Sequence, residues 1–309
     1  MNLTVVGLGL VGTSIALALK AVSDDITVVG HDADSNRVKR AKELGGIDKS
    51  HWNLLAACEE ADLILLDVGL KEMKTTLEAL GDEVKENTVI VDTFALKRPV
   101  LELAQRLLPD ETRFVGGNVV SPKLRKTQAP SATLLQGATF FLVPPKGVDS
   151  EAVDIASNLA EAVGAAPRYI DATEHDGLAA ATLQLPLLSA LAMGRTLHAE
   201  PGVEERQRAM GGALADMLSL LSGSRALSVD AFLENRENVL RWLDTYGSRL
   251  DTLRALLADG EAKSLQEEIA RAREIGAEWM GDAVSGEEDE VTREGWRGLL
   301  SGGLGRRRV

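Results

Sequence analysis

The chain has 309 residues, of which 45% are hydrophobic and 26% are charged, as is usual for a soluble globular protein with room for two domains. A net charge of −13 argues against nucleic acid as a partner, because phosphate contacts need a basic face. Cys58 is the only cysteine, which excludes an intrachain disulfide and favours a reducing, cytoplasmic location. The N-terminus has no basic region and the apolar run 3–19 is interrupted by Gly and Thr, so we predict neither a signal peptide nor a membrane span and expect no membrane association.

The first predicted element is a strand that runs through a glycine-rich turn into a helix. Residues 3–12 read LTVVGLGLVG, and the helical stretch TSIALALKAV follows at once. In such a GxGxxG turn, Gly7 permits the tight turn, Gly9 lets the backbone approach a pyrophosphate, and Gly12 lets the helix pack on the strand. The start of the helix offers N–H groups and a partial positive charge to phosphates. The order of these elements predicts a dinucleotide-binding site.

An acid follows the second predicted strand, ITVVG at 26–30. Asp32 lies about 20 residues beyond Gly12, where a carboxylate accepts hydrogen bonds from the adenosine ribose hydroxyls. Its charge would repel a 2′-phosphate, which favours NAD over NADP, although Arg37 lies close enough in sequence to support NADP. The predicted cofactor-binding residues are Gly7, Gly9, Leu10, Val11, Gly12 and Asp32.

Short apolar strands continue to alternate with helical stretches as far as about residue 172. Strands separated by helices predict a Rossmann-type, doubly wound parallel sheet of the α/β class, with ligands at the carboxyl ends of its strands. The further strands are predicted at 63–68, 88–93, 113–117, 139–144 and 167–172.

The second part of the chain is almost continuously helical in pattern. The stretch TEHDGLAAATLQLPLLSALAMGRTL is apolar around most of its circumference, so it must be buried in a core or a subunit interface. We expect Pro186 to kink it. The predicted organisation is a dinucleotide-binding domain at 1–165, an all-helical substrate and dimerisation domain at 166–281, and a disordered tail at 282–309.

The order of several segments resembles the prephenate and arogenate dehydrogenases of tyrosine biosynthesis. The resemblance extends over about residues 3–280 and rests on GLGLVGTSIALALK, AKELGGIDKS, EEADLILL, VIVDTFALK, RFVGG, EHDGLAAATLQLP and FLENRENVL. It implies that the ring alcohol of a small cyclic acid is oxidised by hydride transfer to nicotinamide, with loss of a carboxylate. It also implies a histidine directly after RFVGG, in a His-Pro-x-x-Gly pattern, that handles the hydroxyl proton. Asn118 stands at that position, and an asparagine cannot act as a base.

Other segments also depart from the family pattern. The Asp-x-x-Ser-x-Lys segment keeps Asp92 and Lys97 but has lost its hydroxyl. Lys97 is either a group that meets a substrate anion or the nicotinamide ribose, or a solvated lysine. In the Ser-His-Leu-Pro-His segment Gln184 replaces a histidine, and it is a candidate hydrogen-bond donor to substrate. The family's substrate-binding arginine falls near Ser219, and Arg225 is the nearest cation.

One histidine remains near the expected cleft. His175 lies between Glu174 and Asp176, and two interpretations stay open. It is either a helix-start residue satisfied by its neighbours or a relocated acid–base group oriented by Asp176. The candidate catalytic residues are therefore Asn118, Lys97 and His175.

The sequence leaves three functions open. The first is an NAD-dependent oxidoreductase that acts on prephenate, arogenate or a related cyclic acid through an altered site. The second is a catalytically inactive NAD(H)-binding homodimer with a regulatory or interaction role. The third is a reductase for an uncharged or differently charged substrate, because the expected cleft has lost its histidines. The expected partners are a small-molecule substrate and a second copy of the chain, and no metal is expected.

Overall fold

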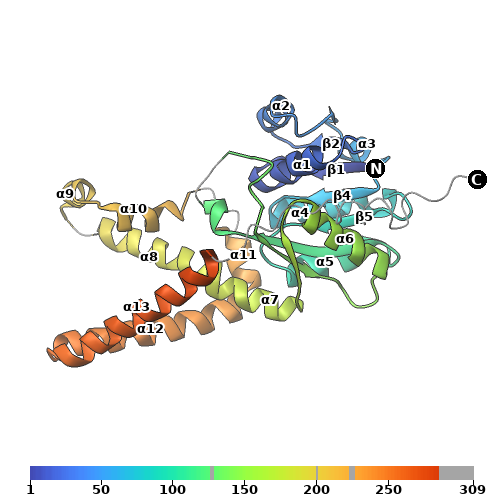
Figure 1. The fold of residues 1–309 in the computed structure, drawn as a ribbon. Coiled ribbons are helices and arrows are strands. Elements are labelled where there is room, and N and C mark those ends of the chain that lie inside the picture. Colours follow the sequence, from blue (N-terminus) through green and yellow to red (C-terminus); the bar gives the residue numbers. More distant parts are fainter. Residues whose placement is uncertain (126–128, 200, 223–226, 285–309) are drawn as a thin grey trace, which may run out of the picture. The chain divides into compact units, whose positions relative to one another are not determined.

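The computed structural model describes residues 1–284, except residues 126–128, 200 and 223–226. The chain divides into two compact units: Met1–Thr173, and the helices from Glu174 onward. The first unit is an α/β layer structure and the second is all-helical, as the sequence predicts (Figure 1).

The first unit is built on one sheet with the strand order β3-β2-β1-β4-β5-β6-β7-β8. The central strand β1 pairs in parallel with β2 on one side and β4 on the other, so the strand order reverses there. Open α/β sheets bind ligands at such a switch point, beyond the carboxyl ends of the strands. The strands are β1 (Asn2–Val6), β2 (Thr27–His31), β3 (Lys49–Ser50), β4 (Leu63–Leu66), β5 (Val89–Asp92), β6 (Arg113–Val120), β7 (Thr139–Val143) and β8 (Ala166–Tyr169).

One pairing departs from the predicted all-parallel sheet. β6 and β7 are antiparallel, with Gly117 opposite Leu142 and Asn118 opposite Phe141. The described residues between these strands contain only the short 3-10 turn η2 (Pro122–Arg125) and no crossover α-helix. A parallel pairing needs such a crossover, so the chain turns back instead.

Helices cover both faces of the sheet (Figure 1). Alternate residues of β4 point to opposite faces, and Leu63 and Leu65 join the core under α1 and α6. The other face is covered by α4 and α5, which contact each other. The helices of this unit are α1 (Leu10–Val22), α2 (Ser35–Glu43), α3 (Leu54–Cys58), α4 (Leu70–Leu80), α5 (Arg98–Leu107) and α6 (Ser150–Ala162), with the 3-10 turn η1 (Gly81–Glu83).

The first unit extends further than the predicted domain boundary at 165. β8 pairs with β7 and so belongs to the sheet, and the unit ends at Thr173. At the other end of the helical unit, α13 continues to Val284, past the predicted end at 281. The rest of the predicted tail lies outside the described residues.

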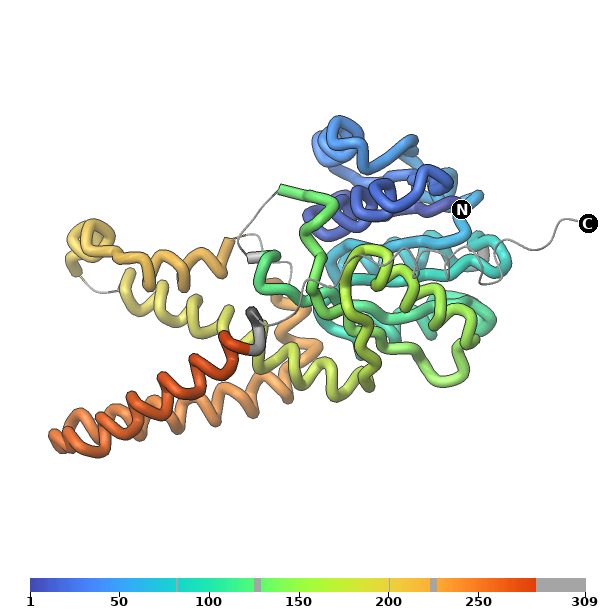
Figure 2. The backbone as a smooth tube through the Cα atoms, viewed as in Figure 1, coloured from blue at the N-terminus to red at the C-terminus, as the bar shows by residue number. Residues whose placement is uncertain are grey.

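In the second unit, α12 packs against η3, α8, α11 and α13, and α8 also contacts α9 and α10. α12 and α13 lie side by side, as Figures 1 and 2 show. α12 ends at Ala258, and Gly260, between α12 and α13, has a φ of 68°. The helices are α7 (Ala172–Ala179), η3 (Ala180–Gln184), α8 (Leu185–Ala199), α9 (Val203–Arg208), α10 (Gly212–Ser219), α11 (Val229–Glu234), α12 (Arg236–Ala258) and α13 (Ala262–Val284).

The stretch predicted as one kinked helix contains a π-helical turn, η3. Pro186 is the second residue of α8, directly after this turn. Proline has no N–H for the carbonyl four residues earlier and its ring crowds that carbonyl, so a widened turn accommodates it. The predicted irregularity at Pro186 is therefore a π turn placed just before the proline.

The same stretch is the one long apolar helical stretch among the described residues. Ala172–Ala199 is long and apolar enough, by length and composition, to cross a membrane, and 28% of its apolar window is buried within the chain. An interface helix of a soluble oligomer has the same character. The stretch is therefore not buried on all sides within one chain, which was one of the two predicted environments.

Candidate nucleotide site and the predicted catalytic residues

The turn after β1 is closed by direct backbone contact between its glycines and the end of β4. Gly7 has a φ of 94°, and a Cβ there would lie 2.1 Å from the carbonyl oxygen of Asp67. A Cβ on Gly12 would lie 2.3 Å from the carbonyl oxygen of Gly7. Both positions therefore accept only glycine without a rearrangement of the backbone.

The start of α1 has no side-chain cap. Gly9 is the N-cap residue, and the first intrahelical hydrogen bond runs from Thr13 N–H to Gly9 C=O at 3.1 Å. The N–H groups of Leu10 and Val11 precede this ladder, as the first N–H groups of any α-helix do. They lie at the positive end of the helix dipole, which suits them to bind an anion such as a pyrophosphate.

Asp32 follows β2 and is held against the same turn. Its Oδ2 accepts a hydrogen bond from the N–H of Leu8 at 2.8 Å, and its Oδ1 accepts one from the N–H of Asp34 at 2.8 Å. Arg37 Nη1 lies 3.6 Å from Oδ2. Each carboxylate oxygen has a second lone pair, so this fixed carboxylate can still accept hydrogen bonds from two ribose hydroxyls.

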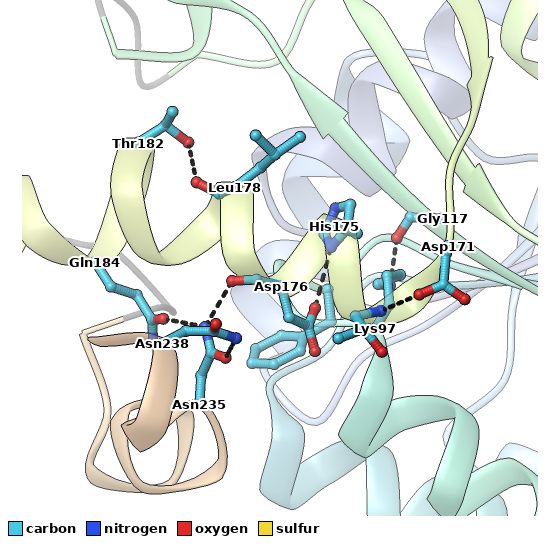
Figure 3. Close-up of polar contacts among 12 residues, drawn as sticks. Lys97, Gly117, Asp171, His175, Asp176, Leu178, Thr182, Gln184, Asn235 and Asn238 are labelled. Atoms are coloured by element: carbon cyan, nitrogen blue, oxygen red, sulfur yellow. Dashed lines mark hydrogen bonds and ion pairs between the residues drawn. The ribbon is translucent and has the colours of Figure 1, made fainter. Parts of the chain in front are cut away.

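A buried ion pair lies between the end of β5 and the middle of β6. Lys97 Nζ donates to Asp92 Oδ2 and to the carbonyl oxygen of Gly117, and both charged side chains are fully buried. Figure 3 also shows the carboxylate of Asp171 pointing toward the Lys97 ammonium group. Lys97 is thus engaged inside the first unit, and the predicted alternative of a solvated lysine is wrong. Burial raises the pKa of Asp92, although Lys97 and two backbone N–H groups oppose this rise.

The same pair holds the backbone just before Asn118. Gly117 donates its N–H to Asp92 Oδ1 at 2.9 Å and accepts from Lys97 at its carbonyl oxygen. A Cβ at Gly117 would lie 2.4 Å from the carbonyl oxygen of Asp92, so the strands meet too closely for any other residue. Asn118 itself is partly exposed on β6.

In the second unit, His175 and Asp176 are both buried, at 2% exposure each. His175 Nδ1 lies 3.1 Å from Asp176 Oδ1, so the carboxylate orients the imidazole ring. This contact is common to both interpretations of His175, because it satisfies the ring and it is also the geometry of an oriented acid–base group.

Gln184 lies in a buried amide network of the second unit (Figure 3). Its Nε2 donates to the carbonyl oxygen of Ala231 at 2.8 Å, and its Oε1 accepts from Asn235 Nδ2 at 2.7 Å. Asn235 also donates to the carbonyl oxygen of Asp176 at 2.8 Å and accepts from Asn238 at 2.9 Å. The sequence prediction assigned no role to Asn235 and Asn238, although both lie in FLENRENVL, one of the segments that carry the family resemblance.

The other histidines and the segment near the family's substrate-binding arginine occupy other positions in the fold. His31 Nδ1 lies 3.0 Å from the carbonyl oxygen of His51, and His198 is exposed in the last turn of α8. Ser219 donates to the carbonyl oxygen of Asp216 at 2.6 Å, and Arg225 lies outside the described residues. The described residues contain no group of three or more His, Cys, Asp or Glu side chains that could hold a metal ion.

Comparison with known families accounts for both units. The nucleotide-binding domain of prephenate dehydrogenase matches residues 15–168, and the dimerization domain of prephenate dehydrogenase matches residues 171–271. The chain belongs to the prephenate dehydrogenase family.

Relatives of this prephenate dehydrogenase family member cover most of its length. A prephenate dehydrogenase of Bacillus subtilis is 26% identical over 262 residues, 84% of this chain and 71% of the relative. A cyclohexadienyl dehydrogenase of Zymomonas mobilis is 26% identical over 277 residues, 88% of this chain and 94% of the relative.

Solved structures share the fold of this family member. Prephenate dehydrogenase from A. aeolicus, in complex with hydroxyphenyl propionate and NAD+, has a TM-score of 0.80 at 23% identity and covers 90% of this chain and 98% of its own. Synechocystis arogenate dehydrogenase has a TM-score of 0.71 at 21% identity and covers 90% of this chain and all of its own. The predicted family and its two-part architecture are confirmed.

Proposed function

We propose that this protein is an NAD-dependent dehydrogenase that oxidises the ring alcohol of a small cyclic acid, with a substrate site that departs from its family's pattern. The turn after β1 carries the first half of this proposal. Gly7 and Gly12 leave no room for side chains, and the start of α1 is uncapped by any side chain of its own N-cap residue. When bound, NAD supplies the hydride acceptor.

The chain's own groups fit such a dinucleotide. The N–H groups of Leu10 and Val11 would bind the pyrophosphate, and Asp32 would accept hydrogen bonds from the adenosine ribose. The preference for NAD over NADP follows from the Asp32 charge. The nucleotide-binding match and the NAD+ complex of the A. aeolicus relative support the same cofactor.

Asn118 supports the second half of the proposal. It can donate a hydrogen bond to a substrate hydroxyl or carbonyl oxygen and so orient it, but it cannot take a proton. Loss of general-base assistance costs about 10²–10⁴-fold in rate. We therefore expect weak or no turnover of prephenate and arogenate, the substrates that the family name suggests.

Lys97 and Gln184 act as positioning residues in this proposal. Lys97 donates to the carbonyl oxygen of Gly117, and Asp92 accepts from the Gly117 N–H. Together with the Lys97–Asp92 ion pair, these contacts fix the strand that presents Asn118. Gln184 uses both ends of its amide to join η3, α11 and α12. His175, oriented by Asp176, is the remaining candidate for proton transfer among the described histidines.

We also propose that the protein is a homodimer through its helical unit. A helix as apolar as Ala172–Ala199 with 28% of its apolar window buried needs a further surface to cover it. The dimerization-domain match supports the same assembly. Light scattering at micromolar concentration should give twice the chain mass, and a monomer would contradict the proposal.

Two measurements test the proposed reaction. Calorimetry with NAD+ and NADH should show saturable binding to the folded protein, and its absence would overturn the cofactor assignment. Turnover on prephenate and arogenate, followed at the NADH absorbance band, should fall well below an ordinary rate of about 10 s⁻¹. A rate near that value would show that another group, such as His175, has replaced the missing base.

A further inference from the structure

Asp67 is a buried acid that the GxGxxG pattern does not require. It directly follows β4 and is 3% exposed. Its Oδ2 accepts a hydrogen bond from the N–H of Gly12 at 2.8 Å, and its Oδ1 accepts one from the hydroxyl of Thr93 at 2.8 Å. A carboxylate of the protein itself therefore lies against the first turn of α1.

That turn is also the predicted pyrophosphate site. The positive end of a helix dipole is equivalent to about half an elementary charge, which is less than the full charge of one carboxylate. Gly9 gives α1 no side-chain cap, and the first turn of α1 contains no acidic residue. Asp67 thus supplies a negative charge to this helix end from the neighbouring strand, and it occupies the N–H of Gly12.

We propose that Asp67 is an affinity-determining residue whose carboxylate weakens binding of the dinucleotide pyrophosphate at α1. The inference rests on the proposed nucleotide function. The packing of Gly7 and Gly12 against Asp67 fixes the carboxylate close to the turn. The mechanism is electrostatic: the fixed carboxylate opposes the field that α1 offers to an incoming anion. Weaker binding also means faster release, because affinity differences among variants of one site reside mostly in the dissociation rate.

The variant Asp67→Asn separates the charge from the hydrogen bonds. The amide oxygen of asparagine can accept from the N–H of Gly12, and its NH₂ group can donate to the Thr93 hydroxyl. Thr93 can then donate to the carbonyl oxygen of Leu66, which lies 3.4 Å from its Oγ1. Both contacts of the turn persist while the charge is removed.

The matched control is Asp62→Asn at the opposite end of β4. Asp62 Oδ2 accepts a hydrogen bond from the N–H of Asn2 at 2.8 Å, so it too is a carboxylate bonded to backbone beside β1. The control changes the net charge of the protein by the same amount. It lies at the amino ends of the strands, away from the nucleotide turn.

Calorimetric titration with NAD+ and with ADP-ribose, at low ionic strength, tests the proposal. Asp67→Asn should bind both ligands about threefold to tenfold more tightly than the wild type, since both contain the pyrophosphate. Asp62→Asn should match the wild type. The variant Asp67→Ala removes charge and hydrogen bonds together and should still bind more tightly if the charge dominates.

Three results would overturn the inference. Unchanged or weaker binding by a folded Asp67→Asn would mean that the carboxylate organises the turn without opposing the ligand. Equal tightening in Asp62→Asn would assign the effect to net charge. If the wild type and all variants are folded but bind neither ligand, the proposed function itself fails, and this inference fails with it.

Discussion

The glycine turn after β1 and the Asn118 position on β6 belong to the same sheet, but the sequence determines them differently. In the turn, the groups expected to meet the ligand are backbone N–H groups, and glycine at Gly7 and Gly12 is required by backbone contacts. At Asn118 a single side chain decides what chemistry is possible. A binding site made of backbone tolerates changes in the side chains around it, whereas a catalytic site loses its reaction when one side chain is replaced. The cofactor half of the proposed function therefore rests on backbone geometry, and the substrate half rests on the identity of one side chain.

The two regions also differ in how they use buried charge. Asp32 is held by two backbone N–H groups and stays close to an exposed arginine. Lys97 and Asp92 are fully buried and neutralise each other while they fix Gly117. The first arrangement leaves lone pairs for a ligand, and the second stabilises the strand that presents Asn118.

The largest expected effect is on the free energy of unfolding, through the buried ion pair of Lys97 and Asp92. Lys97→Met leaves the buried carboxylate of Asp92 without its cation, which should lower the free energy of unfolding by about 3–5 kcal/mol. Urea unfolding measures this loss. The double variant Asp92→Asn with Lys97→Met removes both charges and should recover a large part of it.

The loss in Lys97→Met should also depend on pH. Burial raises the pKa of Asp92, and removal of Lys97 raises it further. A group with a raised folded-state pKa contributes stability at low pH that is lost as the pH rises. The variant should therefore be closer to the wild type near pH 5 than near pH 8. A loss below about 1 kcal/mol at both pH values would show that the pair does not hold the strand end.

The next effect is on the glycine turn. In Gly12→Ala the added Cβ would lie 2.3 Å from the carbonyl oxygen of Gly7, so the first turn of α1 must move away from the strand. We expect the affinity for NAD+ to fall about a hundredfold or more, measured by calorimetry, because the backbone N–H groups lose their alignment. Gly247→Ala in α12, where a Cβ meets nothing within 4 Å, is the control and should bind normally. An unchanged affinity in Gly12→Ala would remove the argument that backbone geometry makes this site.

The third effect is a gain of catalytic turnover from a base at position 118 on β6. Asn118→His places a base at the partly exposed position where the family pattern has its histidine. Turnover of prephenate or arogenate should rise about tenfold to a hundredfold, at the low end of what general-base catalysis contributes, because other family residues are also replaced. The rise should appear in kcat and should fall off below about pH 6.5, as an imidazole protonates. If Asn118→His gives no gain while His175→Ala abolishes a residual activity, the proton acceptor has moved to the helical unit.

The sequence predicted the elements of the first unit because hydrophobic periodicity and turn-forming glycines are local features. Strands such as 63–68 and the glycine positions follow from a few neighbouring residues. The antiparallel pairing of β6 and β7 was not predicted, because apolar strands of either direction look alike. The environments of Lys97 and Gln184 depend on partners 20 and 51 residues away, namely Gly117 and Asn235. Contacts over such separations are set by the packing of whole elements, so residue type alone could not distinguish a ligand-binding lysine from a buried one.

The smallest expected effect is on the choice between NAD+ and NADP+, at Asp32 in the nucleotide-binding region. In Asp32→Asn one oxygen is replaced by an NH₂ group, which cannot accept from the N–H of Leu8 or Asp34. The loss of charge also removes the repulsion of a 2′-phosphate and the attraction that holds Arg37 Nη1 3.6 Å from Asp32 Oδ2. We therefore expect the ratio of NAD+ to NADP+ affinity to fall about tenfold, or about 1.4 kcal/mol, with weaker NAD+ binding and unchanged or tighter NADP+ binding.

The control is Asp34→Asn, which removes the same charge two residues away while an asparagine still caps α2 through the N–H of Asn36. Calorimetry with both cofactors should show no change of the ratio in this control. Equal ratios in the wild type and Asp32→Asn would mean that the carboxylate serves the turn through Leu8 and does not select the cofactor.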